Sequence, residues 1–493
     1  MRKNIIKISI ILTYFINCLL AQEYNQPLTM QGLNHTTNHS VISIGMGGVS
    51  LLKNDVSVMF SNPAALQSLE GIQVSVGGLL QYKTNEQVQH WFVNWNYSNL
   101  SLLMEGLTDQ IPDPVIDPSV PFPTAKDSVP RPFDDLKPNW KNRKDEKLPL
   151  QFFAALPVKV NNVKMVVGLG AVEYANLNRY YENRNVLSPD IGSLRKNVFY
   201  IPATDADNLA LPVYWLRSIS YRSGSIYGYG GTVSIGLLDK FAFGVSLLTL
   251  DGTTREYEYL TGRGLLIFHR TYFGLYPYND KNFYKTNGIS EYSGTEFTLS
   301  ASYRLKNANF GITAKPVNTI KRDYKYIATI DSAGSIIQSQ EVNGKDEMVL
   351  PCRGSLELNI DIKENLAVAI MYEIMPYSKA IYVDSKSGST SKPWLDIYKF
   401  GIGFEYSPLK WLLLRGGYSK QTDVFSPEGD YFTIDPVPFE TYSLGTGFKY
   451  SGFQVNLAYQ YTRLKYVDKW ATNVNTNTES LQNIVATVSY TLK

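Results

Sequence analysis

Histidine and cysteine are scarce in this chain of 493 residues, which has four histidines and two cysteines. Cys18 lies in a segment that we expect to be cleaved, so Cys352 would remain without a disulfide partner. His35 and His39 have the i, i+4 spacing of a helical metal pair, but no helical apolar pattern surrounds them. We therefore expect no disulfide, no bound metal and no cofactor. The stability of the exported chain must come from another source.

Catalytic motifs and an excess of charge are also missing. The chain has no Gly-x-Ser-x-Gly elbow, no His-Glu-x-x-His, and no phosphate-loop or dinucleotide motif. Its 47 basic and 44 acidic residues give a net charge of +3, which argues against nucleic acid as a partner. We expect no enzymatic activity. A surface hydrolase that uses His90 or His269 from a loop is the least favoured alternative.

No apolar run is long enough to cross a membrane as a helix. Basic residues at positions 2, 3 and 7 precede an apolar stretch over 8–20 that three polar residues interrupt. The small residue Ala21 comes just before a possible cut at Gln22. This arrangement is typical of a secretory signal peptide, which we assign to residues 1–21 and exclude from the fold.

Tyrosine, in contrast, is abundant. The 35 tyrosines outnumber the 22 phenylalanines and 7 tryptophans together. Tyrosine has an apolar ring and a polar hydroxyl, which suits the interface between a membrane and water. A soluble tyrosine-rich β-protein or a sugar-binding protein would have the same composition, so the periodicity of the sequence has to decide.

Alternation with a period of two recurs from residue 71 to the end. Apolar or aromatic residues occupy every second position in 453–461, 398–406 and 356–362, and the positions between them hold mostly glycine and polar residues. Because successive side chains of a strand point to opposite faces, each of these strands has one apolar side and one polar side.

A membrane barrel explains this alternation better than a soluble sandwich. Aromatic residues stand at both ends of the apolar faces, for example Tyr398 with Tyr406 and Phe453 with Tyr461, as aromatic girdles require. The opposite faces are rich in glycine, which weakens ordinary strands. Carboxylates on these predicted lumen faces, such as Glu357, are expected to pair with lumen bases or to tune passage rather than to catalyse a reaction.

The connections alternate between short and long, as in bacterial outer-membrane barrels. Six short links contain turn-forming residues, and seven long links fall near residues 105–147, 176–216, 258–291, 331–345, 384–394, 422–437 and 467–480. These thirteen links predict an all-β fold, a transmembrane antiparallel barrel of fourteen strands over residues 71–493. Both 71–82 and 89–103 resemble strands, and we assign the second to the first outer loop because Gly71 directly follows the N-terminal segment.

The last strand pattern suits membrane assembly. Residues 484, 486, 488, 490 and 492 form an apolar face, and the residues between them form a more polar one. Terminal strands of this kind resemble the signals that barrel-assembly machinery reads. The chain ends Leu492-Lys493 and so lacks the usual closing aromatic residue.

Residues 22–70 lack sustained alternation and would have to lie inside or beneath the barrel. Gly45, Gly47 and Gly48 permit tight turns and close packing against a wall. Further on, Asn62, Pro63 and Ala64 follow an apolar stretch, with Pro63 biasing Asn62 away from helical geometry and Asn62 able to bond nearby backbone. We predict that residues 22–70 form an N-terminal plug, with a plain loop as the alternative.

This glycine-rich segment with its Asn-Pro-Ala resembles the plug of FadL-like outer-membrane transporters. The resemblance covers residues 40–82 by motif and the remainder by strand architecture. It implies passive uptake of hydrophobic compounds, such as long-chain fatty acids or hydrocarbons, through a lumen that the plug blocks until a ligand displaces it. It also implies an outer-membrane location in a Gram-negative-type bacterium, with membrane lipid and a hydrophobic small molecule as partners.

In that family the third strand is kinked, and cargo can leave sideways through a gap in the wall. The corresponding strand here is 163–181, so the resemblance implies a gate strand that contains Gly168, Gly170, Tyr174 and Ala175. The family often has Tyr-Gly-Leu at the kink, whereas this chain has Tyr-Ala-Asn-Leu.

The same glycine and Asn-Pro-Ala region also resembles PorV-like barrels of the superfamily. That resemblance implies a different function, in which the barrel serves secretion or surface attachment of other proteins and has secretion-system proteins as partners. The sequence leaves this alternative open.

Overall fold

A computed structural model describes most of the chain after residue 39. The described residues are 33, 40–50, 53–91, 139–160, 163–188, 211–238, 240–268, 273–332, 335–384, 390–391, 394–427, 435–469 and 473–492. The predicted signal peptide, residues 1–21, and residues 22–32 of the predicted plug lie outside them.

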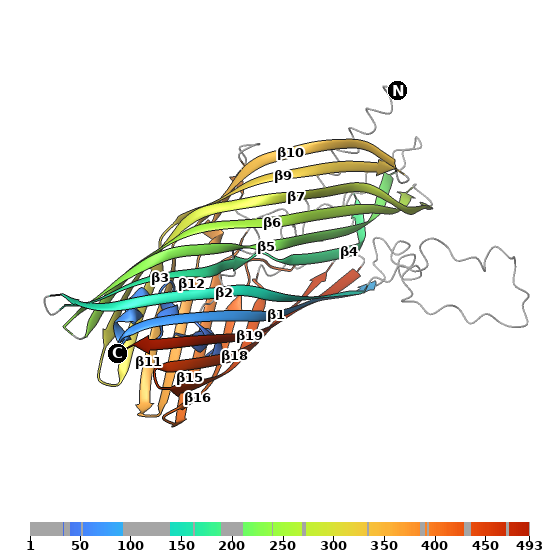
Figure 1. Cartoon of the computed structure of the whole chain (residues 1–493). Helices are drawn as coiled ribbons and strands as arrows, with labels where there is room; N and C mark the ends of the chain where they lie inside the picture. Colours follow the sequence, from blue (N-terminus) through green and yellow to red (C-terminus); the bar gives the residue numbers. More distant parts are fainter. Residues whose placement is uncertain are drawn as a thin grey trace, which may run out of the picture.

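One large antiparallel sheet contains every described strand (Figure 1). In chain order the strands are β1 (Ile72–Trp91), β2 (Trp140–Val160), β3 (Val163–Asn176), β4 (Arg179–Ser188), β5 (Leu211–Leu237), β6 (Phe241–Phe268), β7 (Phe273–Arg304), β8 (Ala308–Lys315), β9 (Asn318–Ser332), β10 (Ser335–Leu350), β11 (Arg353–Lys363), β12 (Leu366–Met375), β13 (Ile381–Asp384), β14 (Thr390–Ser391), β15 (Ile397–Leu409), β16 (Leu412–Thr422), β17 (Pro438–Tyr450), β18 (Phe453–Lys469) and β19 (Asn473–Leu492).

The sheet closes on itself because the last strand pairs with the first. The ladder between β1 and β19 runs from Ile72 opposite Leu492 to Trp91 opposite Asn473. Four strands of the wall are interrupted, so that each consists of two segments: β3 and β4, β8 and β9, β10 and β11, and β12 and β13. The short β14 pairs only with β13 and is not a separate wall strand. The result is a closed barrel of fourteen strands, as predicted. Closure pairs the first wall strand with the last and so provides a source of stability that needs no disulfide.

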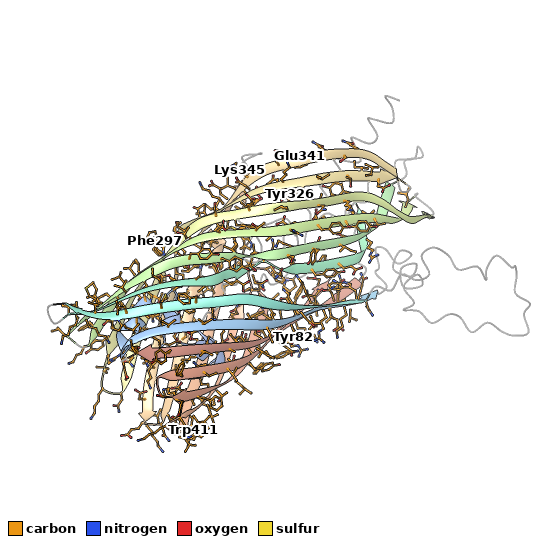
Figure 2. All side chains as sticks on the ribbon, in the orientation of Figure 1. Tyr82, Phe297, Tyr326, Glu341, Lys345 and Trp411 are labelled. Carbon is orange, nitrogen blue, oxygen red and sulfur yellow. The ribbon has the colours of Figure 1, made fainter. Side chains whose placement is uncertain are left out.

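The apolar faces point outward. On β6, Phe243, Val245 and Leu247 are 40 to 50% exposed, whereas Ser246 between them is 2% exposed. Phe297 on β7 lies in the same apolar belt (Figure 2). A protein that exposes such a continuous belt requires a lipid environment.

The predicted long loops at 258–291, 331–345 and 467–480 were wrong, because strands occupy most of these three segments. β6 extends to Phe268 and β7 begins at Phe273, so only residues 269–272 separate them. Likewise, only residues 333–334 separate β9 from β10. Beyond Leu247 the outward side chains of β6 become Asp251, Thr253 and Arg255. Above the membrane both faces of a strand can be polar, so the alternation disappears from the sequence although the hydrogen-bond ladder continues. In Figure 1 these extensions of β5–β7, β9 and β10 rise together on one side.

The predicted limits of the first outer loop were also wrong. β1 continues to Trp91 and β2 already begins at Trp140, so 89–91 belong to the wall and residues 92–103 lie outside the described part.

Three of the four interruptions coincide with prolines. Pro316 separates β8 from β9, Pro351 separates β10 from β11, and Pro376 follows β12. The ladders place Lys315 opposite Arg353 and Gly354 opposite Ile374, so the three prolines lie at nearly the same height on neighbouring strands. Because proline has no N–H to donate, each breaks the ladder. They mark the level at which the membrane barrel passes into the extension.

The described helices are short: α2 (Val41–Gly45), η1 (Val56–Val58), η2 (Pro63–Ser68) and η4 (Tyr377–Lys379). None of them has the length and hydropathy needed to cross a membrane. α2, η1 and η2 lie inside the barrel, where the largest apolar cluster combines residues of η1 and η2 with the inner faces of the wall.

Candidate functional site: the plugged lumen and the interrupted third strand

The described N-terminal residues fill the lumen at the end with the short turns. Ser40 caps α2 by accepting a hydrogen bond from the backbone N–H of Ser43 at 3.1 Å. All residues from Ser40 to Ser50 are buried, although most of them lie in neither a helix nor a strand. Their burial places the segment inside the wall, where the sequence had predicted a plug.

The glycine-rich turn of this segment packs on a patch of glycines in the wall, which we call the glycine seat: Gly403 of β15, Gly417 of β16 and Gly445 of β17. A Cβ on Gly45 would lie 3.1 Å from the Cα of Gly445, and a Cβ on Gly417 would lie 2.1 Å from the carbonyl carbon of Met46. The plug backbone can approach the wall this closely because the wall residues of the seat have no side chain.

Gly47 and Gly48 turn the chain above this seat. Their φ angles are +76° and +85°, in the left-handed region that favours glycine. A Cβ on Gly47 would also lie 2.7 Å from the backbone nitrogen of Tyr418. Both conformation and space therefore require glycine at position 47.

Asn62, Pro63 and Ala64 contact the opposite side of the wall. The Asn62 side chain does not bond nearby backbone, as the sequence had suggested, but donates to Glu357 of β11 at 2.9 Å. Pro63 begins η2, where its missing N–H costs nothing, and its Cβ lies against Gly244. The Ala64 N–H donates to Ser300 of β7 at 2.7 Å. The wall thus supplies the hydrogen-bond partners of this turn.

Two lysine contacts secure the rim of the plug. Lys53 forms an ion pair with Asp361 of β11. Lys164 of β3 donates to the backbone carbonyls of Gln67 and Leu69, at 2.8 and 2.6 Å. Because these groups are partly exposed, we expect each contact to contribute little to stability while fixing the position of the segment.

A cavity of about 350 Å³ lies directly above the glycine turn. Ile44, Gly47 and Gly48 contribute its floor, and the inner faces of the surrounding strands form its walls. We call this space the chamber. Gly47 and Gly48, two of the predicted plug glycines, thus border the chamber.

Hydrogen-bonded carboxamides line one wall of the chamber. Gln81 of β1 donates to Asn483 of β19 at 3.1 Å, and Asn483 donates to Gln460 of β18 at 3.2 Å. A second row lies higher, where Trp140 of β2 donates to Gln87 and Gln87 donates to Asn477, at 3.1 and 2.9 Å. Most of these amide groups already satisfy one another, and Lys83 and Glu86 of β1 and Glu479 of β19 also line the chamber, so a ligand meets both uncharged and charged polar groups on this side.

The interrupted third strand, which β2 separates from β1, forms another side of the chamber. Val172, Glu173, Tyr174 and Ala175 are all buried. A wall strand with one face in lipid would bury only alternate residues, so this stretch bends into the lumen. Its ladder with β5 shifts register between Glu173 and Ala175, as at a β-bulge. A bulge therefore accompanies the bend, at a position where this chain has no glycine.

The wall separates beside this bend. The described ladder between β2 and β3 stops at Phe152 opposite Ala171, and the upper part of β2 pairs only with β1. Side chains bridge the two strands, because Trp140 makes edge contacts with Tyr180 and Tyr181 of β4 at ring distances of 5.8 and 6.2 Å. The chamber reaches this gap, since its lining includes residues 176–181.

The four residues of the predicted gate strand do not lie together: two are below the bend and two are at the bulge. Gly168 and Gly170 lie below the bend, where Cβ atoms would come within 3.0 Å of Met59 and 2.9 Å of Phe60. They therefore make room for the plug. Tyr174 lies at the bulge and donates to Glu296 of β7 at 2.7 Å, while Ala175 is fully buried beside it.

Buried charges hold the interruptions in place, which the sequence analysis missed. Glu296 accepts hydrogen bonds from Lys315 at the end of β8, from Arg353 at the start of β11 and from Tyr174 at the bulge. One carboxylate of β7 thus connects three places where the wall is broken. The sequence signal that could have revealed this is a single charged residue among the small polar residues of the inner face of β7.

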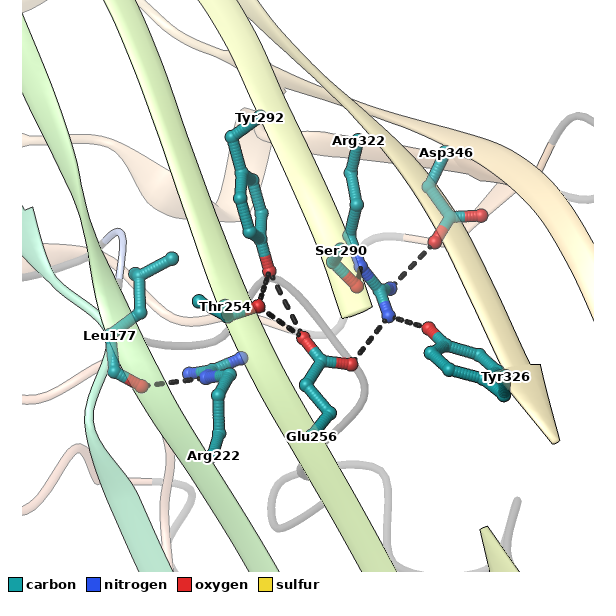
Figure 3. A network of polar contacts seen from close by, with 9 residues as sticks. All are labelled: Leu177, Arg222, Thr254, Glu256, Ser290, Tyr292, Arg322, Tyr326 and Asp346. Carbon is teal, nitrogen blue, oxygen red and sulfur yellow. Dashed lines mark hydrogen bonds and ion pairs between the residues drawn. The ribbon is translucent and has the colours of Figure 1, made fainter. Parts of the chain in front are cut away.

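A second network secures the extension above the bend (Figure 3). Arg322 of β9 is 1% exposed and pairs with Glu256 at 3.0 Å and Asp346 at 2.8 Å. Arg222 of β5 donates to the carbonyl of Leu177 at 2.6 Å, which fixes the chain where β3 ends. The bend is therefore attached to β5, and the strands beyond it are tied to one another.

In the described part of the chain, no group of three or more histidine, cysteine or acidic side chains could hold a metal ion. His35, His39 and His269 lie outside that part. Cys352 is exposed beside the Pro351 interruption.

Solved structures of other proteins share this barrel fold. No protein-family model and no curated protein matches the sequence. A FadL homologue from Pseudomonas aeruginosa superposes with a TM-score of 0.54 at 13% identity, over 93% of this chain and 99% of that chain. The Pseudomonas putida toluene transporter TodX gives 0.49 at 14% identity, covering 92% of this chain and 99% of its own, and the Ralstonia pickettii toluene transporter TbuX gives 0.48 at 12% identity, covering 92% and 98%.

The fold and the filled lumen define a plugged outer-membrane β-barrel. More specifically, the chain has the FadL-like barrel fold, because its closed sheet superposes on the Pseudomonas aeruginosa homologue.

Proposed function

We propose that this protein passes hydrophobic compounds, such as long-chain fatty acids or hydrocarbons, through the outer membrane of a Gram-negative-type bacterium, with the N-terminal segment as its gate. The observation that carries the proposal is the position of the chamber. Its floor is the Gly47–Gly48 turn of the same segment that fills the lumen. A ligand in the chamber would therefore touch the gate. The FadL-like fold supports the same function.

The chamber suits a ligand with an apolar body and one polar group. Aromatic side chains of the upper wall, including Trp140 and Tyr181, can pack against the apolar body. The carboxamides of Gln460 and Asn483 can exchange one hydrogen bond for a bond to the polar group. Within the proposed class this combination favours a long-chain fatty acid over a plain hydrocarbon.

Gating requires the α2 part of the segment to leave the glycine seat, whereas residues 53–69 are held to the wall by several hydrogen bonds and an ion pair. The glycine seat contributes close packing without interlocking side chains, and the Asn62–Glu357 bond fixes the other side. A ligand that binds better when α2 has moved would shift the population toward the open state. The gap between β2 and β4 beside the chamber offers an exit sideways into the membrane, and the short-turn end offers an exit into the periplasm.

Uptake of labelled ligands by cells tests the proposal. We expect deletion of the gene to lower the uptake of oleate, and re-expression to restore it. Toluene, which has no polar group, should show a smaller difference. Unchanged oleate and toluene uptake would contradict the proposal. If uptake stayed normal while surface-attached proteins were lost, the PorV-like role in protein export would replace it.

Asn62→Ala tests the gate separately. Removing one partner of a buried hydrogen bond costs about 1–3 kcal/mol, so its loss should raise the open population roughly fivefold or more. Planar-bilayer recordings should show a higher leak current. Asn359→Ala is a matched control, because Asn359 is buried on the same face of β11 and its side chain has no hydrogen-bond partner among the described residues. Equal currents for the two variants would contradict the role of Asn62.

A further inference from the structure

The outer wall of the barrel has a groove behind the glycine seat. It occupies about 600 Å³ on the lipid-facing side of β12 and β15–β18. Gly416 lies at its base, where a Cβ would come within 2.7 Å of the Phe404 ring. The outward side chains that line the groove are Val368, Ile402, Phe404, Tyr418, Tyr442, Leu444, Tyr459 and Tyr461. The missing side chain at Gly416 therefore leaves a hollow in the apolar belt.

The chemistry of this groove fits a hydrocarbon chain. Its lining is aliphatic and aromatic, and it opens into the part of the surface that faces lipid tails. The tyrosine hydroxyls mark its upper rim, where Tyr418 and Tyr442 donate to Glu440 at 3.3 and 3.4 Å. An acyl chain in the groove would thus end at a polar boundary, as lipid chains do at the membrane interface.

Cations lie just above that boundary. The ladders place Lys420 of β16 and Arg463 of β18 on either side of Glu440. Lys465 follows on the same face of β18, and all three cations are exposed. None of them forms an ion pair with a residue that the structure describes. Three cations against one carboxylate make this rim positive, which favours an anionic headgroup.

The leaflet follows from the direction of the strands. The turn after β15 and the turn Ser451–Gly452 lie at the short-turn end, whereas the tyrosine rim lies toward the opposite end of the same strands. In a FadL-like barrel the short turns face the periplasm, so the rim belongs to the outer leaflet.

We propose that this groove is a binding site for a phosphorylated lipid of the outer leaflet. One acyl chain lies over Gly416 between Phe404 and Leu444, and a phosphate of the headgroup lies near Lys420 and Arg463. The strands that hold the lipid also carry the glycine seat on their inner face, because Gly403 and Gly417 contact Met46. The site is separate from the chamber and its existence does not depend on the proposed transport.

Native mass spectrometry of the full-length protein with added lipid A tests this site. After delipidation we expect one lipid A molecule to rebind, and the double variant Lys420→Gln and Arg463→Gln to lower its affinity about tenfold or more, since each cation near a lipid headgroup contributes measurably. The matched control is Lys321→Gln with Lys325→Gln, which removes two exposed cations from the outer face of β9. This control should bind lipid A normally.

A second variant tests the acyl-chain part of the site. Leu444→Trp should fill the groove and abolish binding, whereas Leu247→Trp on the distant β6 should have no effect, since both positions are exposed in the apolar belt. Folding of each variant is checked by the heat-dependent shift of the barrel in gel electrophoresis. The double charge variant alters only exposed side chains, so it keeps the test valid if Leu444→Trp fails to fold.

Three outcomes would overturn the proposal. Equal lipid A binding by wild type, charge variant and control would mean that only general annular lipid is present. Equal binding of phosphatidylcholine would remove the role of the anionic headgroup. Dimers that exclude lipid A and are lost in Leu444→Trp would show that a second copy of the chain covers the groove instead.

Discussion

The contact between α2 and the wall depends on residues that have no side chain. Gly417 faces Met46 on the inside, while its neighbour Gly416 faces Phe404 on the outside. A methyl group at Gly417 meets plug backbone, which cannot rotate away, whereas a methyl group at Gly416 meets a ring that can.

These neighbouring glycines provide a matched pair of variants. We expect Gly417→Ala to weaken the seat by about 1–3 kcal/mol, the usual cost of overpacking, and to raise the leak current in planar bilayers. Gly416→Ala should leave the current unchanged. If Gly417→Ala also remained closed, the seat would not hold the plug.

Glu296 should be the most sensitive polar residue of the interior. Glu296→Gln would leave Lys315 and Arg353 without their carboxylate in a buried setting, which costs about 3–5 kcal/mol. Urea unfolding in lipid vesicles, followed by tryptophan fluorescence, measures this loss. Glu347→Gln removes an exposed pair with Lys321 and should cost less than about 1 kcal/mol. Similar losses for both variants would mean that Glu296 does not connect the interruptions.

At this scale the sequence could indicate which plug residues matter but not what they contact. Gly45, Gly47, Gly48 and the Asn-Pro-Ala turn were recognisable because glycine and proline restrict or free the backbone locally. Glu357, the partner of Asn62, lies 295 positions away and is one of several similar carboxylates. Only the closure of the barrel decides which of them faces the plug.

Among the strands, β5–β7 differ most from the sequence prediction, because they extend into segments that were predicted to be loops. Their inner face carries buried acidic side chains well above the apolar belt, including Glu256 and Glu258 of β6. Burial, together with the neighbouring charge of Glu256, raises the pKa of Glu258 from 4.5 to about 7. The folded extension therefore favours the protonated acid.

This raised pKa makes the extension sensitive to pH. The contribution of protonated Glu258 is fully present below pH 4.5 and is lost as pH rises through about 7, at a total cost of about 3 kcal/mol because one pKa unit corresponds to roughly 1.4 kcal/mol. We expect amides of β6 and β7 to exchange faster at pH 8 than at pH 5 after correction for intrinsic rates. Glu258→Gln should remove the difference, and Glu341→Gln, at an exposed site, should retain it. An identical pH response in wild type and Glu258→Gln would refute the assignment.

The strands of the membrane belt were predictable, whereas their ends were not. In 453–461 one face meets lipid and the other meets the lumen, so the alternation is strong. In β9 and β10 the outer face carries pairs such as Asp323 with Lys345, and Figure 2 shows Lys345 and Glu341 on this outer part. Solvent on the outside removes the apolar signal there. The bulge in β3 was missed because a change of ladder register has no signature in composition.

At the scale of the whole molecule, an apolar exterior surrounds a lumen that contains the N-terminal segment. The exterior followed from the sequence because it is a repeated pattern over many strands. The fit of residues 40–70 into the lumen could not, because it depends on contacts between distant segments such as Gly45 with Gly445 and Lys53 with Asp361.

The central claim is that this segment closes the passage and moves to open it. A reversible tether tests it most directly. A Cβ on Gly311 would lie 3.2 Å from the Asn62 amide nitrogen, so Asn62→Cys with Gly311→Cys brings two thiols together, in a Cys352→Ser background that removes the exposed native thiol. Each single-cysteine variant serves as a control.

The measurement is oleate uptake into cells that express the tethered protein, before and after reduction. We expect no uptake while the disulfide is intact and full uptake once a reductant has opened it, with no effect of reductant on the single-cysteine variants. Equal uptake in both states, with the disulfide verified by mass spectrometry, would show that ligands pass without movement of the N-terminal segment and would contradict the account.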